Sequence, residues 1–289
     1  MAERPNTNLS RFRSDDGCVE LYAREDVARS LVEAGALRNV ALAELEVAHD
    51  RGRMGRGSLV QIDLPGRVPL LVKTLRHGGI LGPVLGAHYL GSRRLLRAIE
   101  LILHLERHAV ATAKMVFGRV RRSSRLSACV HLELCTEQIG EAVDLLQALR
   151  NEEPGSRRRR RSIAACASLV RALHQAGVFH VDLHPRNILV ERNSLDRAWI
   201  LDLDGSRVVA DLEPRSVIEN FERLFRSLVK EGLFPGKVSR AEMGRFLQAY
   251  EAQEWRARWR ATARRFALRV PFHRLAWWAG RALNRVLDR

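Results

Sequence analysis

The chain has 289 residues, 46% of them apolar, which is enough to bury one large domain or two smaller lobes and excludes broad disorder. The chain has no run of eighteen apolar residues, so a membrane span is not expected, and its N-terminus lacks the apolar core of an export signal. The four cysteines form no CxxC pair, so reduced thiols in a cytoplasmic protein are expected. The formal net charge of +16 favours a polyanionic partner, either an anionic membrane surface or nucleic acid, unless it only reflects arginine-rich coding in a GC-rich genome.

The first half of the chain is predicted to be rich in strands. The stretch "LVQIDLPGRVPLLVK" (59–73) has two apolar runs around a Pro/Gly turn, which predicts a hairpin. In "SRRLLRAIELILHLERHA" (92–109), apolar residues recur at helical spacing and predict a buried amphipathic helix. The stretch "RLSACVHLELC" (125–135) is strand-like.

A composition break follows at "RNEEPGSRRRRRS" (150–162), which we interpret as a charged loop because Pro154 and Gly155 stop a helix. Ser162 is then expected to cap the helix of "IAACASLVRALHQAG", which Gly177 ends. The five arginines at 157–161 are expected to be mainly solvated, with lipid phosphate binding as their alternative role.

The second half is predicted to be mostly helical around one polar hairpin. The apolar runs "NILVE" (187–191) and "AWILDLDG" (198–205) are spaced like paired strands, and 213–231 and 240–254 have helical patterns. The sequence therefore predicts an α+β architecture, with a β-rich lobe over residues 1–137 and a helical lobe over residues 138–289.

The stretch "HVDLHPRNILV" (180–190) holds polar residues at fixed offsets immediately before an apolar strand. Transfer of a phosphoryl group from ATP needs a carboxylate to orient the acceptor hydroxyl, ligands for Mg²⁺ and cations on the phosphate oxygens. Asp182 and Asn187 lie five positions apart between a helix and a strand, so one side chain can face the acceptor while the other faces a metal.

Other residues would complete a phosphotransfer site. Asp202 offers the main Mg²⁺ carboxylate, with Asp204 as the competing candidate two residues along. Lys73 offers a phosphate-binding ammonium group, and Glu100 could hold it in position. In "RGRMGRGS" (51–58), Gly55 and Gly57 would let the backbone approach the phosphates, although each of these features alone also fits an ordinary turn, strand or helix residue.

In their order along the chain, these motifs resemble the protein-kinase-like fold, and most closely its lipopolysaccharide kinases of the 3-deoxy-D-manno-octulosonic acid (Kdo) kinase group. The narrower resemblance is carried by "GRGSLVQI", by residues 71–105 and by "NFERLFRSLVKEG" (220–232), and with the catalytic hairpin it extends from about Gly52 to Tyr250.

The resemblance implies a catalytic role for Asp182, metal binding by Asn187 and Asp202, and phosphate positioning by Lys73 with Glu100. It also implies ATP and Mg²⁺ as cofactors and a glycolipid acceptor of the Kdo–lipid A type at the cytoplasmic face of the inner membrane. A heptose kinase, a Ser/Thr protein kinase and an inactive nucleotide- or lipid-binding module remain the alternatives.

Departures from protein kinases favour a sugar acceptor over a protein. Val181 and His184 stand where many protein kinases have arginine and lysine, and "LDLDG" has aspartate in place of the glycine of their metal motif. The segment 205–215 is short and lacks an Ala-Pro-Glu anchor for a peptide-binding platform.

The C-terminal segment 256–289 combines arginines with tryptophan, phenylalanine and leucine, a pattern that suits the headgroup zone of an anionic leaflet. Packing of these aromatic residues on the helical lobe is the alternative, and Pro271 argues against one unbroken helix. No nucleic-acid-binding motif occurs, so nucleic acid is not expected as a partner.

Overall fold

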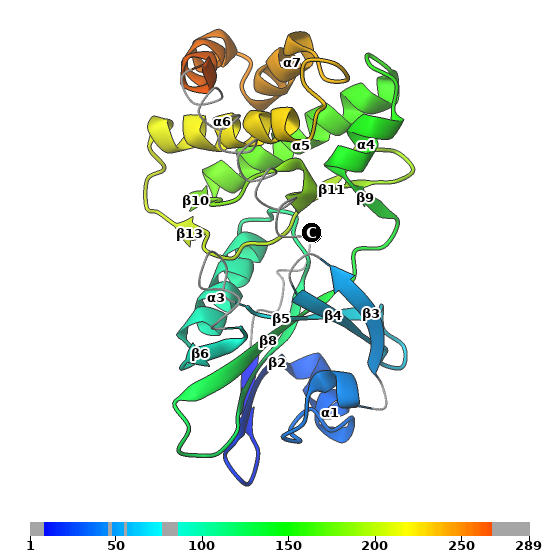
Figure 1. Cartoon of the computed structure of the whole chain (residues 1–289), viewed down its shortest axis with the longest axis vertical. Helices are drawn as coiled ribbons and strands as arrows, with labels where there is room; N and C mark the ends of the chain where they lie inside the picture. Colours follow the sequence, from blue (N-terminus) through cyan, green and yellow to red (C-terminus); the bar gives the residue numbers. More distant parts are fainter. Residues whose placement is uncertain (1–8, 46–47, 55–56, 77–85, 268–289) are drawn as a thin grey trace, which may run out of the picture. The chain divides into compact units, whose positions relative to one another are not determined.

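The computed structural model describes residues 9–45, 48–54, 57–76 and 86–267, which divide into two compact units (Figure 1). Unit 1 comprises the described residues up to Arg107 together with Ala113–Gly140, and unit 2 comprises His108–Thr112 together with the described residues from Glu141 onward. The predicted α+β order, strand-rich first and mostly helical second, is confirmed.

Unit 1 is built on an antiparallel eight-stranded sheet in the order β1-β2-β7-β8-β5-β4-β3, with β6 also paired to β8. Its strands are β1 Leu9–Arg13, β2 Val19–Arg24, β3 Ala48–Met54, β4 Gly57–Ile62, β5 Leu70–Thr74, β6 His88–Leu90, β7 Met115–Arg122 and β8 Cys129–Glu137. The predicted hairpin over 59–73 is confirmed, because β4 and β5 pair from Leu59↔Lys73 to Ile62↔Leu70.

Helices pack on both faces of this sheet. Helix α1 (Glu25–Glu33) and the short 3-10 helix η1 (Leu42–Glu44) contribute to a core that includes Phe117 of β7. Helix α3 (Arg93–Arg107) packs on the opposite face, where a Cβ atom on Gly118 would lie 2.6 Å from Ile99 Cδ1. Glycine at this point of β7 therefore lets α3, which carries Glu100, lie close against the sheet.

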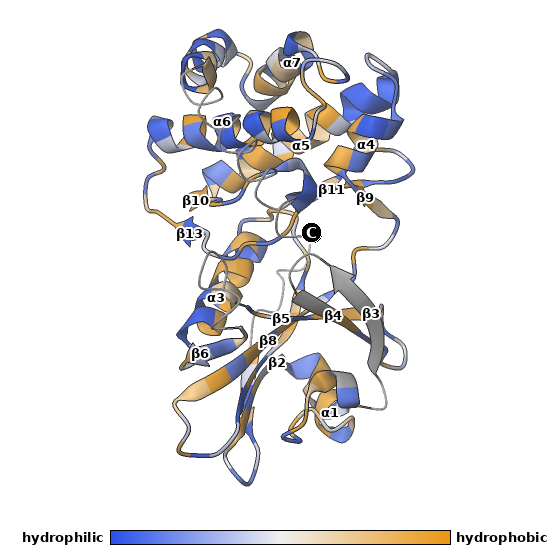
Figure 2. Ribbon diagram, in the orientation of Figure 1, coloured by the Kyte–Doolittle hydropathy of each residue, from blue (hydrophilic) through white to orange (hydrophobic). Residues whose placement is uncertain are grey.

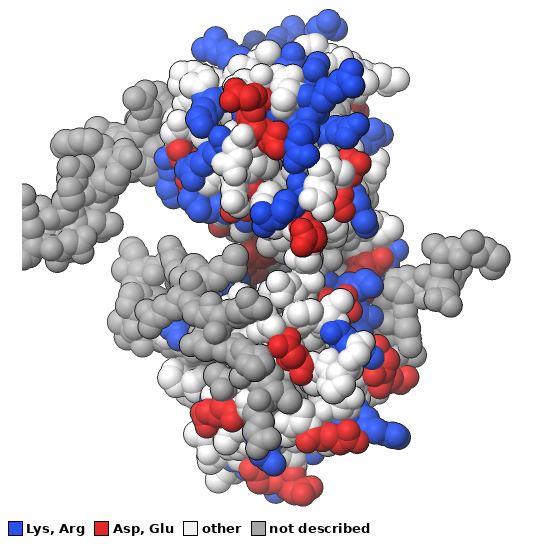
Figure 3. Space-filling model, turned by 90° about the vertical axis from the view of Figure 1, so that its right-hand side faces the viewer, with Lys and Arg blue, Asp and Glu red and all other residues white. Residues whose placement is uncertain are grey.

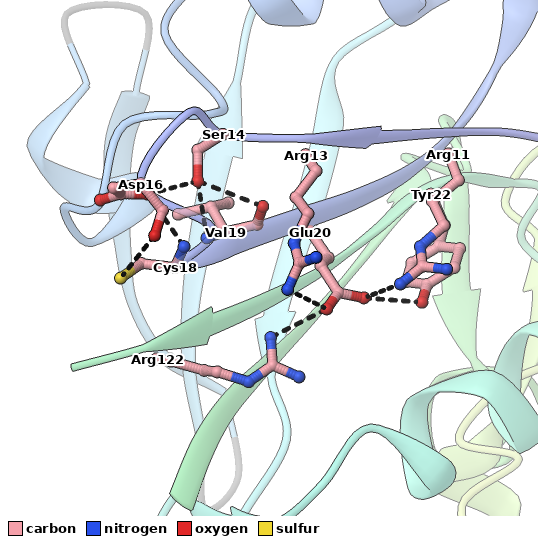
Figure 4. A network of polar contacts seen from close by, with 9 residues as sticks. All are labelled: Arg11, Arg13, Ser14, Asp16, Cys18, Val19, Glu20, Tyr22 and Arg122. Atoms are coloured by element: carbon pink, nitrogen blue, oxygen red, sulfur yellow. Dashed lines mark hydrogen bonds and ion pairs between the residues drawn. The ribbon is translucent and has the colours of Figure 1, made fainter. Parts of the chain in front are cut away.

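The hairpin of β1 and β2, which the sequence did not predict, is held by the buried carboxylate of Glu20 (Figure 4). Arg11 and Tyr22 donate hydrogen bonds to Glu20 at 2.9 and 3.0 Å, and Arg122 of β7 donates another at 3.0 Å. Burial alone would raise the pKa of Glu20, but these hydrogen bonds and the arginine charges lower it. The carboxylate thereby joins β1, β2 and β7.

Unit 2 contains the helices α4 to α7, a further helix at residues 255–267 and two small sheets. The helices are α4 Leu145–Asn151, α5 Arg157–Gln175, α6 Pro214–Lys230 and α7 Arg240–Tyr250. The strands are β9 Ala142–Asp144, β10 Val178–Phe179, β11 Ile188–Glu191, β12 Ala198–Ile200 and β13 Arg207–Val208. Strands β11 and β12 pair as the predicted antiparallel hairpin. Helix α6 carries both apolar and polar residues (Figure 2), and its buried apolar residues are Val217, Phe221, Leu224, Phe225 and Leu228.

Helix α5 begins earlier than predicted. Its N-cap is Ser156, whose Oγ accepts a hydrogen bond from Arg159 N at 3.1 Å, whereas Ser162 lies inside the helix and donates to the carbonyl of Arg159 at 2.8 Å. The predictions of a loop through 157–161 and of a cap at Ser162 are therefore wrong. Serine was available at both positions, and the sequence pattern did not distinguish them.

Arg159 also contradicts the expectation of a solvated arginine run, because its side chain is completely buried. It contacts Glu242 of α7 at 2.6 Å and donates to the carbonyls of Leu149 and Glu152 at 2.7 and 2.9 Å, and also to the carbonyl of Lys237. One guanidinium thus connects the start of α5 to α4, α7 and the chain before α7.

The first part of the basic C-terminal segment packs on unit 2. Residues 255–267 are helical; Arg258 contacts Glu251 at 2.5 Å, Arg265 contacts Glu219 at 3.0 Å, and Phe266 lies edge-on to Phe234. The rest of that segment, with Pro271, lies outside the described residues. Among the described helices, none has the length and apolar character needed to span a membrane.

We predict that Arg159→Met lowers the free energy of unfolding by about 3–5 kcal/mol, because it leaves the buried carboxylate of Glu242 without its counter-ion. Arg160→Met is the matched control, since the neighbouring side chain is exposed and a surface change costs within about 0.5 kcal/mol. Urea unfolding of both variants checks this, and equal losses would show that Arg159 is not a structural hub.

Candidate active site

The polar loop between α5 and β11 lies wholly within unit 2. Gly177 follows α5 with φ +71°, and a Cβ atom there would lie 2.5 Å from the carbonyl oxygen of Val209, so this turn requires glycine. Strand β10 comes next, then the loop His180–His184, and then the 3-10 helix η2 (Pro185–Asn187), which leads directly into β11. Asp182 and Asn187 are therefore held between regular elements, as the motif predicted.

Asn220 of α6 holds the start of this loop by its backbone. Its Nδ2 donates to the carbonyl of His180 at 2.8 Å, and its Oδ1 accepts from the backbone N–H of His180 at 3.4 Å. The ring of His180 is fully buried, its Nδ1 accepts from Asp182 N at 3.2 Å, and its Nε2 faces the carbonyl of Leu201 at 3.1 Å. His180 thereby joins the residue before Asp202 to Asp182 itself.

These contacts fix the protonation of two buried histidines. In His180, Nδ1 accepts a hydrogen bond, so Nε2 must carry the proton that is donated to Leu201. In His174 of α5, Nε2 donates to Asn220 Oδ1 at 3.0 Å and Nδ1 accepts from Tyr250 at 3.0 Å. Burial lowers the pKa of His180 and lowers that of His174 to about 4, so both rings are neutral at pH 7.

Asp182 points its carboxylate toward solvent, with 60% of the side chain exposed. His184 Nε2 lies 3.4 Å from Asp182 Oδ2, and His184 Nδ1 accepts from Arg186 N, so the proton on Nε2 is directed at the carboxylate. The hydrogen bond from His184 lowers the pKa of Asp182, and the positive charge of Arg223 adds to this effect. Asp182 is therefore ionised at neutral pH and able to accept a hydrogen bond from a hydroxyl.

Asn187 and Asp202 present oxygen donors that suit Mg²⁺. Asn187 Nδ2 donates to the carbonyl of Asp182 at 2.9 Å, which leaves its Oδ1 as the acceptor end of the amide. Leu201 N donates to the carbonyl of Asn187 at 2.8 Å. This hydrogen bond holds Asp202, the residue after Leu201, close to Asn187 along the backbone. Asp202 turns the chain after β12 with φ +50°, a left-handed conformation that aspartate adopts more readily than most residues.

This donor set fits a metal held partly by phosphates. Among the described residues, no group of three or more His, Cys, Asp and Glu side chains could hold a metal ion. Mg²⁺ in phosphotransfer sites is bound through one or two carboxylates together with phosphate oxygens and water, so one carboxylate and one amide oxygen are sufficient.

The predicted nucleotide-binding residues belong to unit 1. Lys73 lies on β5 opposite Leu59 and Leu134, and Glu100 lies on α3; both are exposed. Gly57 begins β4 opposite Met54, whereas Gly55 lies outside the described residues.

Sequence reasoning assigned no role to His174, His180, Asn220 or Tyr250. The available signal was local: a histidine and an asparagine stand within the apolar faces of α5 and α6, beside Leu173 and Phe221. A polar residue at a core position needs a hydrogen-bond partner, but the partner here is 40 or more residues away in sequence.

The sequence of the chain matches a known protein family. The profile of the lipopolysaccharide kinase (Kdo/WaaP) family matches residues 65–250. The 3-deoxy-D-manno-octulosonic acid kinase of Vibrio parahaemolyticus is 30% identical over 183 residues, which cover 61% of this chain and 71% of that protein. The enzyme of the same name from Haemophilus influenzae is 27% identical over 166 residues, covering 54% and 66% respectively.

A solved structure described as WaaP in complex with acyl carrier protein is similar in fold. The similarity has a TM-score of 0.54, at 23% sequence identity, and covers 91% of this chain and 98% of that one. The predicted two-part kinase-like architecture is thereby confirmed.

We predict that stability decreases as the pH falls from 7 to 5. The pKa of His174 is about 4 in the folded protein and near 6.5 when unfolded, so below pH 6.5 the unfolded chain binds the extra proton. The full effect, reached near pH 4, is on the order of 3 kcal/mol. Urea unfolding at several pH values should show a shallower slope in His174→Gln, and an unchanged slope would contradict the assignment.

Proposed function

Because the chain belongs to the lipopolysaccharide kinase (Kdo/WaaP) family, we propose that it transfers the γ-phosphate of ATP to a hydroxyl of Kdo in the lipopolysaccharide inner core, with Kdo–lipid A as the acceptor. The observation that carries this proposal is the loop of unit 2, in which an ionised Asp182 is joined by hydrogen bonds to Asn187 and to the chain before Asp202. The sugar is proposed from relatives that are named Kdo kinases.

Asp182 is the proposed catalytic residue. Its carboxylate accepts a hydrogen bond from the attacking sugar hydroxyl, orients the oxygen toward the γ-phosphorus and receives the proton as the bond to phosphorus forms. His184 holds the carboxylate in place through the contact between Nε2 and Oδ2. The buried ring of His180 fixes the backbone at Asp182, so the carboxylate does not have to be ordered when the substrate binds.

Asn187 and Asp202 are the proposed ligands for Mg²⁺, which when bound neutralises charge on the phosphate oxygens. In unit 1, Lys73, Glu100, Gly55 and Gly57 are assigned to the nucleotide: Lys73 as a cation for phosphate oxygens, Glu100 as its partner, and the glycines as close backbone contacts.

An anionic membrane surface is the proposed partner, because the acceptor is anchored in a bilayer. Several arginines on α5 and one on α7 support this: they are exposed and form no ion pair among the described residues. They are Arg157, Arg160, Arg161, Arg171 and Arg245. On the face of unit 2 that Figure 3 shows, Lys and Arg side chains cover more of the surface than Asp and Glu side chains do. The C-terminal residues beyond Ala267 carry further arginine and tryptophan.

We predict that Asp182→Asn lowers transfer of labelled phosphate from ATP to Kdo–lipid A by about a hundredfold or more, the usual contribution of a positioned general base. Asp15→Asn is the control, because Asp15 is an exposed aspartate in the turn between β1 and β2. Transfer that persists at the wild-type rate in Asp182→Asn would overturn the assigned mechanism.

The same assay tests the membrane partner. Transfer should be faster when the acceptor is embedded in vesicles containing phosphatidylglycerol than in vesicles of phosphatidylcholine alone, and the difference should shrink as salt is added. Equal rates in the two kinds of vesicle would contradict this part of the proposal while leaving the kinase activity intact.

A further inference from the structure

Arg223 of α6 is a cation that the mechanism above does not use. It follows Asn220 by three residues, so both side chains leave the same side of the helix. That side faces the loop His180–Asp182, because Asn220 bonds the backbone of His180 on both its N–H and its carbonyl. The charge of Arg223 accordingly acts on the carboxylate of Asp182.

The guanidinium of Arg223 is only partly satisfied within the protein. Its Nη2 lies 3.4 Å from Glu219 Oε1, at the outer limit of a hydrogen bond, while Arg265 binds the same carboxylate more closely at 3.0 Å. Its Nε is buried without a hydrogen-bond partner among the described residues, yet 27% of the side chain is exposed. By contrast, Arg186, which also lies beside the loop, makes a two-pronged contact with Glu231 at 2.9 and 3.2 Å.

An acidic sugar creates an electrostatic problem at this site. To use Asp182, the acceptor must bring its hydroxyl into hydrogen-bond distance of the ionised carboxylate of Asp182. The carboxylate of the sugar is then separated from that of Asp182 by no more than the width of the sugar ring. Two like charges at such a separation repel each other unless a cation lies between or beside them. A neutral sugar has no such requirement.

We propose that Arg223 binds the carboxylate of the acceptor sugar acid and so selects acidic over neutral sugars; this rests on the function proposed above. The planar guanidinium has N–H donors suited to a two-pronged contact with a carboxylate. His184 is already directed at Asp182 and Arg186 at Glu231, whereas Arg223 follows Asn220 on α6 and its ion pair with Glu219 is long, at 3.4 Å.

The test compares two acceptors: Kdo–lipid A, and the same glycolipid with its Kdo carboxyl groups reduced to alcohols. For the full-length Arg223→Gln variant, we expect kcat/KM to fall about 10- to 100-fold on the acidic acceptor, as for loss of a charged hydrogen bond, and to stay within about threefold of wild type on the reduced one. Arg223→Lys should recover part of the loss because it keeps the charge without the two-pronged geometry.

Arg215→Gln is the matched control, since it removes the same charge from an exposed position in the first turn of α6 and should alter neither rate. The wild-type protein should have a lower kcat/KM on the reduced acceptor than on Kdo–lipid A. This comparison does not depend on whether Arg223→Gln folds. Equal losses on both acceptors, or a wild type indifferent to reduction, would overturn the inference alone. A wild type that phosphorylates neither Kdo acceptor would overturn the proposed function as well.

Discussion

One amide side chain organises the candidate active site. Asn220 bonds both backbone groups of His180 and also accepts from His174, and each of those histidines passes the constraint on. His180 reaches Asp182 and the carbonyl of Leu201, and His174 reaches Tyr250. Helices α5, α6 and α7, the loop His180–His184 and the end of β12 are therefore fixed together through a buried polar network, in which every partner must be present for the others to be satisfied.

The network keeps neutral side chains in the interior of unit 2 and a charged side chain at its edge. The histidines inside it are neutral because burial disfavours their charged forms, whereas Asp182 at its edge is exposed and keeps its charge. A rigid, uncharged interior thus presents one ionised carboxylate at a defined position. Catalysis of phosphoryl transfer depends mainly on positioning and on charge, so this division suits the proposed chemistry.

The large positive charge of the chain has several uses. Arg119 and Arg159 are buried in units 1 and 2; Arg119 contacts Glu133 at 2.8 Å and donates to the carbonyl of Val40, much as Arg159 joins α5 to α7. Other arginines, such as Arg160 and Arg245, are exposed and available to a polyanionic surface. The number of arginines alone therefore overstates the basic surface, because Arg119 and Arg159 are buried with a carboxylate partner and hold the fold.

Local patterns predicted what depends on neighbours in sequence. The hairpin of β11 and β12, the helix α6 and the loop carrying Asp182 and Asn187 follow from short-range periodicity and turn residues. The predicted start of α5 was wrong because a run of arginines looks solvated, whereas Arg159 is buried with partners from other elements, including Glu242, which is 83 residues away. The role of Asn220 was equally invisible, since its partners come from other elements.

The protonation of the two buried histidines tests this organisation most directly. Nitrogen-15 NMR of histidine-labelled protein, assigned with His174→Gln and His180→Gln, reports which ring nitrogen carries a proton. The account predicts that at pH 7 both rings are neutral and protonated on Nε2. A proton on Nδ1 of His180, or a charged imidazolium at either position, would contradict the network that is proposed to position Asp182.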